Sequence, residues 1–229
     1  MDNAVRKKSL ICIAIIVAML IIDQIVKIWI KTTLPIGGDI PLIGQWCRLH
    51  FVENKGIAFG LSFGDSFGKV FLTLFRIVAS VALAFVLARQ LKKDASYSLV
   101  VSLALILVGA VGNVVDSCFY GLIFSESTYE QVATMFPAGG GYAGFLYGKV
   151  VDMFYFPMFH WTWPDWVPWV GGSNGEFFNA IFNVADSCVC VGVALLIIDQ
   201  LWLHPDKKTA EKDAEPASIS GNTVSEEGR

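Results

Sequence analysis

Residues 10–30, with the sequence LICIAIIVAMLIIDQIVKIWI, are apolar except for Asp23, Gln24 and Lys27. A helix needs about 20 predominantly apolar residues to cross a hydrocarbon layer of roughly 30 Å, so this segment is long enough to span a membrane. Three further segments of similar character follow at about 68–88, 97–116 and 179–203. The sequence therefore predicts a membrane all-α fold with four transmembrane helices.

The composition and its change along the chain support this class. Of the 229 residues, 55% are hydrophobic and only 16% are charged, and the mean hydropathy of +0.58 exceeds what a soluble domain of this size needs. We expect one membrane-embedded domain at 1–204, with outer loops at about 31–67 and 117–178. Polar residues dominate 205–229, which predicts a disordered cytoplasmic tail. Membrane lipids are the expected surroundings, the chain is expected to be a monomer, and no nucleic-acid partner is expected.

Basic residues indicate the orientation. Three of them occupy 6–8, before the first predicted helix, and three more lie between the second and third helices at 89–93, whereas Lys149 is the only one in 117–178. Lys and Arg next to membrane segments are retained in the cytoplasm, so both termini are predicted to be cytoplasmic. The N-terminus also resembles a cleavable secretory signal, but no small-x-small site follows and the apolar run continues to Ile30, which favours an uncleaved first helix.

The two outer loops differ in pattern. Residues 47–54, CRLHFVEN, alternate in the way typical of a strand and predict part of a small extracytoplasmic β-sheet. The long loop 117–178 contains four tryptophans, whose rings partition into the headgroup layer, so we expect it to lie on the membrane surface. They are Trp161, Trp163, Trp166 and Trp169.

The histidines and cysteines show no metal-ligand spacing. His50, His160 and His204 are far apart in the sequence, and three of the five cysteines fall inside predicted helices, so a metal site is not expected. Cys47 and Cys118 both lie in predicted outer loops, and whether they pair stays open.

Ionisable residues inside the apolar segments gather toward one side of the membrane. Asp23 lies about seven residues, or roughly 10 Å, below the outer end of its helix, and Asp186 is predicted at a similar depth. Arg76 falls near that level, and Asp116 lies at the outer end of the third helix. Such residues are costly in lipid and often functional, so a site near the outer leaflet is expected.

Several polar residues are spaced to share a helix face. The pairs are Asp23 with Lys27, Asn113 with Asp116, and Asn183 with Asp186, which Asn179 extends by one turn. Interhelical hydrogen bonds alone could explain such residues, and this structural role is the favoured interpretation for the first two pairs.

Asp186 differs because no basic residue lies three or four positions away on its own helix. Asp152, an acid in the apolar patch KVVDMF at 149–154, lies in a loop that must return to the fourth helix. Two carboxylates brought together in a low dielectric share a proton, which leaves one as base and the other as acid. This pair is therefore a candidate for activating water against a peptide carbonyl.

Five short motifs give the chain a resemblance to the prolipoprotein signal peptidases, the signal peptidase II family. Asp23-Gln24 followed by Lys27 is similar to the first-helix motif of that family. The others are NKGIAFG at 54–60, similar to Asn-x-Gly-x-Ala-Phe; GNVVD at 112–116, similar to Gly-Asn-x-x-Asp; VVD at 150–152, similar to Val-Val-Asp-Phe; and FNVADS at 182–187, similar to Phe-Asn-x-Ala-Asp. All five occur in the expected order across four membrane segments.

The resemblance implies an intramembrane aspartic endopeptidase in the bacterial cytoplasmic (inner) membrane, built from four helices and a small outer sheet. Its substrate would be a lipid-modified prolipoprotein, cut just before the cysteine that bears diacylglycerol, without metal or cofactor. Asp152 and Asp186 carry over as the catalytic pair. The residues expected to shape the site are Asn54, Gly56, Asn113, Asp116, Asn183, Asp23, Lys27 and Arg76.

Two departures from the family pattern stand out. Ser117 follows Asp116 where the family usually has Arg, and we hypothesise that Arg76 replaces that charge. The segment between Asp116 and Asp152 is also longer than usual, and we expect it to form a lid or an added hairpin over the site.

Two alternatives remain from the residues alone. A small ion- or proton-conducting membrane protein would use intramembrane acids as a relay, but it needs polar residues along the whole path, and the inner halves of the four helices have almost none. A non-catalytic scaffold would leave Asp152 without a purpose.

Overall fold

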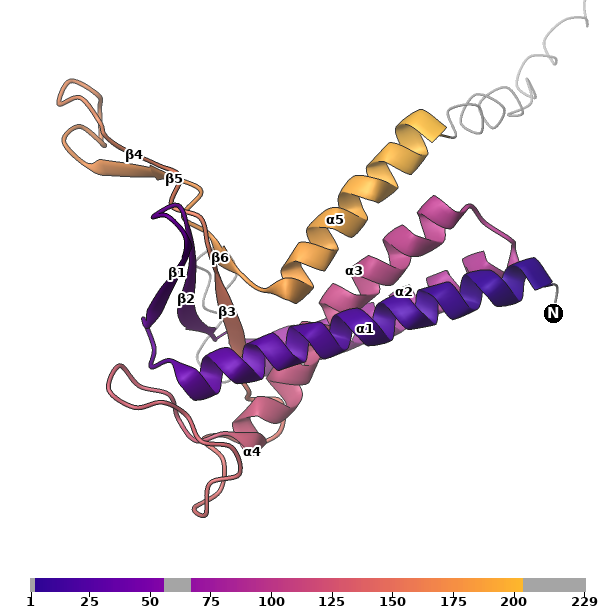
Figure 1. The fold of residues 1–229 in the computed structure, drawn as a ribbon, viewed down its shortest axis with the longest axis horizontal. Helices are drawn as coiled ribbons and strands as arrows, with labels where there is room; N and C mark the ends of the chain where they lie inside the picture. Colours follow the sequence, from indigo (N-terminus) through magenta and orange to yellow (C-terminus); the bar gives the residue numbers. More distant parts are fainter. Residues whose placement is uncertain (1–2, 56–66, 204–229) are drawn as a thin grey trace, which may run out of the picture.

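The structure is a computed structural model that describes residues 3–55 and 67–203 (Figure 1). Four helices in it are long and apolar enough to cross a membrane, as predicted. They are α1 (Asn3–Thr33), α2 (Lys69–Lys92), α3 (Tyr97–Val115) with its continuation to residue 123, and α5 (Val184–Ile198) with its continuation beyond residue 198. The predicted tail at 205–229 lies outside the described residues.

The ends of two helices differ from the predictions. α3 continues through a π-helical turn, η2 (Asp116–Tyr120), into the short α4 (Gly121–Ile123). The predicted start of the last helix at residue 179 is wrong, because α5 begins at Val184 and the residues just before it form strand β6 (Ile181–Phe182). Asn179 therefore lies outside the helix and does not extend its polar face. The last helix ends in a second π-helical turn, η3 (Asp199–Leu203).

Small residues allow the helices to approach closely at the level of the buried charges. A Cβ atom on Gly112 of α3 would lie 2.8 Å from Asp23 Oδ2 of α1 and 2.9 Å from Ala185 Cβ of α5. One turn earlier, a Cβ on Gly109 would lie 2.4 Å from the Ala185 backbone oxygen. Glycine at these positions lets three helices meet around Asp23, which is the usual role of small residues in membrane helix packing.

A four-stranded antiparallel sheet lies at the end of the bundle where α1 finishes and α5 begins (Figure 1). Its strands, in order, are β1 (Asp39–Ile43), β2 (Cys47–Asn54), β3 (Val150–Tyr155) and β6. β2 confirms the strand predicted at 47–54. A separate hairpin of β4 (Phe159–Thr162) and β5 (Asn174–Phe177) projects away from this sheet.

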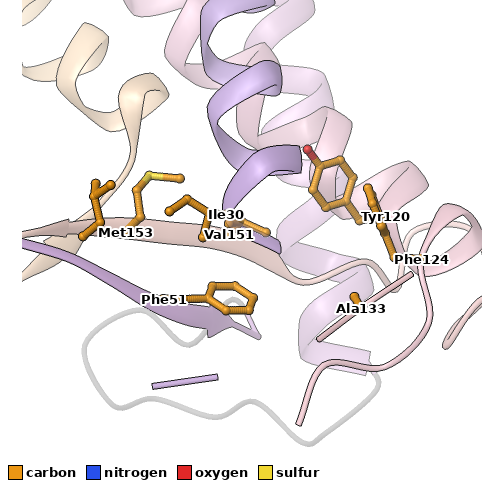
Figure 2. Close-up of a cluster of buried hydrophobic side chains, with 8 residues drawn as sticks. Ile30, Phe51, Tyr120, Phe124, Ala133, Val151 and Met153 are labelled. Atoms are coloured by element: carbon orange, nitrogen blue, oxygen red, sulfur yellow. The ribbon is translucent and has the colours of Figure 1, made fainter. Parts of the chain in front are cut away.

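A buried hydrophobic cluster fixes β3 against the end of α1 (Figure 2). Val151 and Met153 of β3 are fully buried in it beside Ile30 of α1 and Phe51 of β2. Successive side chains of a strand point to opposite faces, so this cluster orients Asp152 away from it.

The segment 124–149, which connects α4 to β3, is attached to the end of α1. Lys31 Nζ lies 2.8 Å from Ser127 Oγ and also pairs with Glu53 of β2. Residues 123–136 fold back as an irregular antiparallel hairpin, in which Phe124 bridges to Met135 and the Ser125 N–H donates to the Thr134 carbonyl. This agrees with the expected added hairpin, and its expected position over the site stays a prediction. Cys47 and Cys118 are both buried free thiols.

Candidate active site

Asp152 lies in the middle of β3 with only 5% of its surface exposed. Its Oδ1 accepts a hydrogen bond of 2.7 Å from Asn183 Nδ2, and the side chain of Asn54 also hydrogen-bonds to it. β3 pairs with β2 in a register that sets Val150 opposite Asn54, so the sheet itself brings Asn54 beside the carboxylate.

Asp186 lies in the first turn of α5, where it forms a reciprocal cap with Asn183. Asn183 Oδ1 accepts a 3.0 Å hydrogen bond from the Asp186 backbone N–H, and the Asn183 backbone N–H donates to Asp186 Oδ2 at 3.3 Å. The two residues predicted to lie together do so, but as a helix cap and not as neighbours on a helix face. Asp186 is therefore at the start of its helix and not one turn inside it.

Two asparagine amides connect the two aspartates. Asn113 Nδ2 donates to Asp186 Oδ1 at 2.8 Å, and Asn113 Oδ1 accepts from Asn183 Nδ2 at 3.1 Å. Since Asn183 also donates to Asp152, a continuous chain of hydrogen bonds runs from β3 through α5 to α3. Asp152 and Asp186 are close enough for the charge of one to act on the other.

Lys27 of α1 is the buried cation of the same network. Its Nζ lies 2.9 Å from Asp23 Oδ2, 2.9 Å from Asp116 Oδ2 and 3.0 Å from Asn113 Oδ1, and the side chains of Lys27, Asp23 and Asp116 have no exposed surface. Asp23 Oδ1 also accepts from the Ala185 backbone N–H at 2.9 Å. Lys27 thus holds the C-terminal part of α3 in place, and Asp23 holds the start of α5.

Gln24 belongs to this network but was not among the predicted site residues. Its Nε2 donates to Asp23 Oδ2 and Asp116 Oδ1, both at 3.0 Å, and its Oε1 accepts from the Tyr120 hydroxyl. Its position next to Asp23 in the first motif was the available signal. Asp116 also accepts from the Val151 backbone N–H at 3.2 Å, which connects α3 directly to the strand that carries Asp152.

The environment of Asp152 changes its acidity. Burial and the nearby charge of Asp186 raise the pKa of the Asp152 carboxyl to about 7, although the hydrogen bonds from Asn183 and Asn54 and the charge of Lys27 oppose the change. At neutral pH this group can therefore give up or take a proton easily. A carboxyl of this kind beside a second carboxylate can act in general acid–base catalysis.

A small recess, which neither aspartate lines, lies among residues of β2, α2, η2 and β3. Its lining residues are Asn54, Lys55, Lys69, Leu72, Thr73, Arg76, Ser117, Gly148 and Val150. Arg76 acts electrostatically on Asp186, Asp152 and Asp116. Lys27 makes the ion pair with Asp116, and Arg76 acts on Asp116 as well, though most strongly on Asp186. That Arg76 replaces the charge usually found at position 117 stays a prediction.

Two points complete the site. Gly56, predicted to shape it, lies outside the described residues, as do 57–60 of the same motif. Among residues 3–55 and 67–203, no group of three His, Cys, Asp or Glu side chains is arranged to hold a metal ion.

Known proteins are similar to this chain in sequence and in fold. The family model described as signal peptidase (SPase) II matches residues 15–202. The chain is 44% identical over 185 residues to a lipoprotein signal peptidase of Porphyromonas gingivalis, covering 81% of this chain and 80% of the relative. It is 35% identical over 183 residues to that of Amoebophilus asiaticus, covering 79% and 73%.

A solved structure described as a bacterial membrane enzyme at 2.3 Å resolution matches with a TM-score of 0.54 and 25% identity, covering 90% of this chain and 94% of that one. A second structure of the same description, at 1.9 Å resolution, matches with a TM-score of 0.51 and 26% identity, covering 82% and 90%. Together with the order of the five motifs, these similarities leave one assignment: the chain belongs to the signal peptidase II family.

Proposed function

We propose that this protein is an aspartic endopeptidase that removes the signal peptide from diacylglyceryl-modified prolipoproteins, cutting before the lipidated cysteine. The observation that carries the proposal is the joining of Asp152 and Asp186 through the amides of Asn113 and Asn183. The relatives named as lipoprotein signal peptidases support the choice of substrate.

In the proposed mechanism, water binds between the two aspartates and the ionised carboxylate removes one of its protons. The resulting hydroxide attacks the peptide carbonyl, while the protonated carboxyl donates its proton to the leaving nitrogen as the C–N bond breaks. Because the two groups titrate as a unit, the proton belongs to the pair and not to one residue. The pKa of Asp152 near 7 supports this sharing at neutral pH.

Asn113, Asn183 and Lys27 act as positioning residues in this proposal. Asn183 orients Asp152 and Asn113 orients Asp186, and each amide oxygen is itself occupied, which fixes both amides in one orientation. Lys27 adds a positive charge that favours ionisation of the pair at short range. Such fixed polar groups stabilise the charged transition state without reorganising.

Arg76 and the recess at Ser117 form the proposed substrate side of the site. The guanidinium acts on Asp186 and Asp152 from the recess, so it can compensate the negative charge that develops on the attacked carbonyl oxygen. Asn54 lines the same recess and hydrogen-bonds to Asp152, which connects substrate position to the pair.

The proposed location is the bacterial inner membrane, with both termini in the cytoplasm, the segment 205–229 as a cytoplasmic tail and the site near the outer leaflet. Two features support this orientation. Lys8 at the start of α1 pairs with Asp94 at 2.7 Å, so the basic residues at 6–8 and 89–93 lie at one end of the bundle. The sheet and the candidate site lie at the other end (Figure 1).

Incubation of the purified full-length protein with a lipid-modified precursor peptide tests the proposal. We expect release of the signal peptide, with the new N-terminus at the lipidated cysteine, and little cleavage of the same peptide without lipid. Equal cleavage of both peptides would contradict the substrate class, and absence of any cleavage would contradict the enzymatic function. Family membership gives no support to the ion-conducting alternative.

A further inference from the structure

The β4–β5 hairpin has two chemically different faces. Trp161 and Trp163 lie two residues apart and so on one face, with their rings 5.7 Å apart and the ring of Trp161 over Gly175. On the other face Thr162 hydrogen-bonds to Asn174, and Glu176 accepts a hydrogen bond from the Tyr155 hydroxyl. One face is therefore aromatic and partly exposed, while on the other Thr162, Asn174 and Glu176 form hydrogen bonds within the protein.

The turn of the hairpin exposes two more large aromatic rings. Trp166 is 81% exposed and Trp169 is fully exposed. Exposure of so large an aromatic ring to water is unfavourable, because its burial gains more free energy than that of most side chains. The hairpin projects away from both the sheet and the helices in Figure 1, so the described part of the chain does not cover these rings.

The charge of the hairpin limits what can cover it. Between residues 156 and 180 the only charged residues are Asp165 and Glu176, and no Lys or Arg is present. An anionic surface therefore finds no Lys or Arg to bind here, so attraction of the hairpin to anionic lipids by charge is not expected. Neutral indole rings with one N–H group each suit the headgroup layer of a bilayer, which is apolar on one side and wet on the other.

The position of the hairpin in the fold is also consistent with contact with the headgroup layer of a bilayer. Three residues separate β5 from β6, and α5 begins two residues after β6, so the base of the hairpin lies at the membrane-entry end of α5. Exposed apolar side chains continue along the chain from Phe178 at the base to Val191 and Ile197 on α5, the surface that a membrane must cover.

We propose that the β4–β5 hairpin inserts its tryptophan face into the headgroup layer of the leaflet next to the candidate site. It lies between Asp152 and Asp186 in the sequence and is connected by three residues to β3 and by three to β6. Insertion therefore also sets the depth at which the two carboxylates meet a membrane-embedded peptide, and this second part rests on the proposed function.

Fluorescence quenching tests the insertion independently of activity. Full-length protein with Trp29, Trp46 and Trp202 changed to Phe retains only the four hairpin tryptophans. In vesicles of phosphatidylcholine brominated near the headgroup, we expect strong quenching by the lipid, weak quenching by acrylamide in water, and no effect of high salt. Removing two of the four rings with Trp166→Ser and Trp169→Ser should remove about half of the lipid quenching.

A matched control and the contradicting outcomes follow from the same measurement. Tyr129→Ser removes an exposed ring from the segment 124–149, outside the hairpin, and should leave lipid quenching unchanged. Strong quenching by acrylamide without quenching by lipid would show that the hairpin lies in water. Weak quenching by both would indicate that a protein partner, such as a second copy, covers the rings. Either result overturns the proposal.

The effect on depth has its own readout. The Trp166→Ser, Trp169→Ser variant should cleave a lipid-modified precursor more slowly than the parent in vesicles, and equally fast in detergent micelles. An equal loss in both would assign the rings to the substrate site and contradict the depth role. Failure of the parent protein to cleave at all would contradict the proposed function and leave the quenching result standing.

Discussion

Two lysines one turn apart on α1, Lys27 and Lys31, are both completely buried, yet they belong to different kinds of cluster. Around Lys31 the charges balance, because Lys31 and Lys149 face Glu53 and Glu126. Around Lys27 they do not. Lys27 pairs with both Asp23 and Asp116. The amides of Asn113 and Asn183 hold two further carboxylates, on which Arg76 also acts.

This difference in charge balance distinguishes a structural cluster, around Lys31, from the candidate site, around Lys27. In the balanced cluster, burial would raise the pKa of Glu53, but Lys31 and Lys149 hold it below its ordinary value, so the ion pairs persist at neutral pH. In the unbalanced cluster the pKa of Asp152 is raised to about 7. A buried group with an excess of like charge around it retains a proton, which acid–base chemistry requires and a structural anchor does not.

Removal of Lys27 should have the largest effect. Lys27→Met leaves Asp23 and Asp116 buried without a cation, a change that typically costs about 3–5 kcal/mol, and it releases Asn113 from its fixed orientation. We expect loss of cleavage together with a clear decrease in the unfolding midpoint in detergent. Normal stability and activity in this variant would contradict the assignment of Lys27 to the candidate site.

Removal of Lys31 should have a smaller effect. In Lys31→Met, Glu53 keeps its 2.9 Å pair with Lys149, so we expect a loss of about 1–3 kcal/mol and faster proteolysis of the segment 124–149. Cleavage should remain, because Lys31 does not contact the amides of the site. Activity as low as in Lys27→Met would show that the two clusters function as one.

The pH dependence of cleavage tests the raised pKa of Asp152, which distinguishes it from Glu53 in the Lys31 cluster. Burial and the charge of Asp186 raise the pKa of Asp152 to about 7, so the aspartate pair holds a proton below about pH 7 and loses it above that pH. Above that pH the shared proton is lost and none is available for the leaving group, so kcat should fall by about tenfold per pH unit. A rate that stays constant from neutral to alkaline pH would contradict the assignment of Asp152. The stability that the protonated Asp152 carboxyl contributes should be lost earlier, as the pH rises from its ordinary pKa of 3.8 to about 7, and should not change further above that pH.

The smallest expected effect concerns Asn54. Its hydrogen bond favours the ionised form of Asp152, so Asn54→Ala should raise the pKa of Asp152 and move the alkaline limb of the pH profile upward by about one unit. Ser127→Ala, which changes the Lys31 cluster, should leave the profile where it is. A downward shift in Asn54→Ala would mean that the bond stabilises the protonated carboxyl.

Local patterns explain what could be predicted from the sequence. Apolar segments of spanning length predicted the four helices, and alternation at 47–54 predicted β2, because both signals depend on neighbouring residues only. The candidate pair was predicted from the cost of an unpaired Asp186 in an apolar segment and from the motifs. Its catalytic role stays a prediction.

Long-range pairing explains what could not be predicted. The start of α5 depends on β6 pairing with β3, so Asn179 was wrongly assigned to the helix. Lys31 lies at a helix end, where lysines usually extend to the headgroups, and nothing local indicates its pairing with Glu53 and Ser127. The two-faced hairpin at 159–177 depends on the register of β4 with β5, which the tryptophans alone did not indicate.

The most direct test of the account is a double-mutant measurement of kcat on a lipid-modified precursor, using Asp152→Asn, Asp186→Asn and the double variant, each verified to be folded. If the two carboxylates act as one unit, each single variant loses at least about 10²–10⁴-fold and the double variant loses hardly more than either. Substantial turnover in either single variant, or losses that multiply in the double variant, would contradict a shared role.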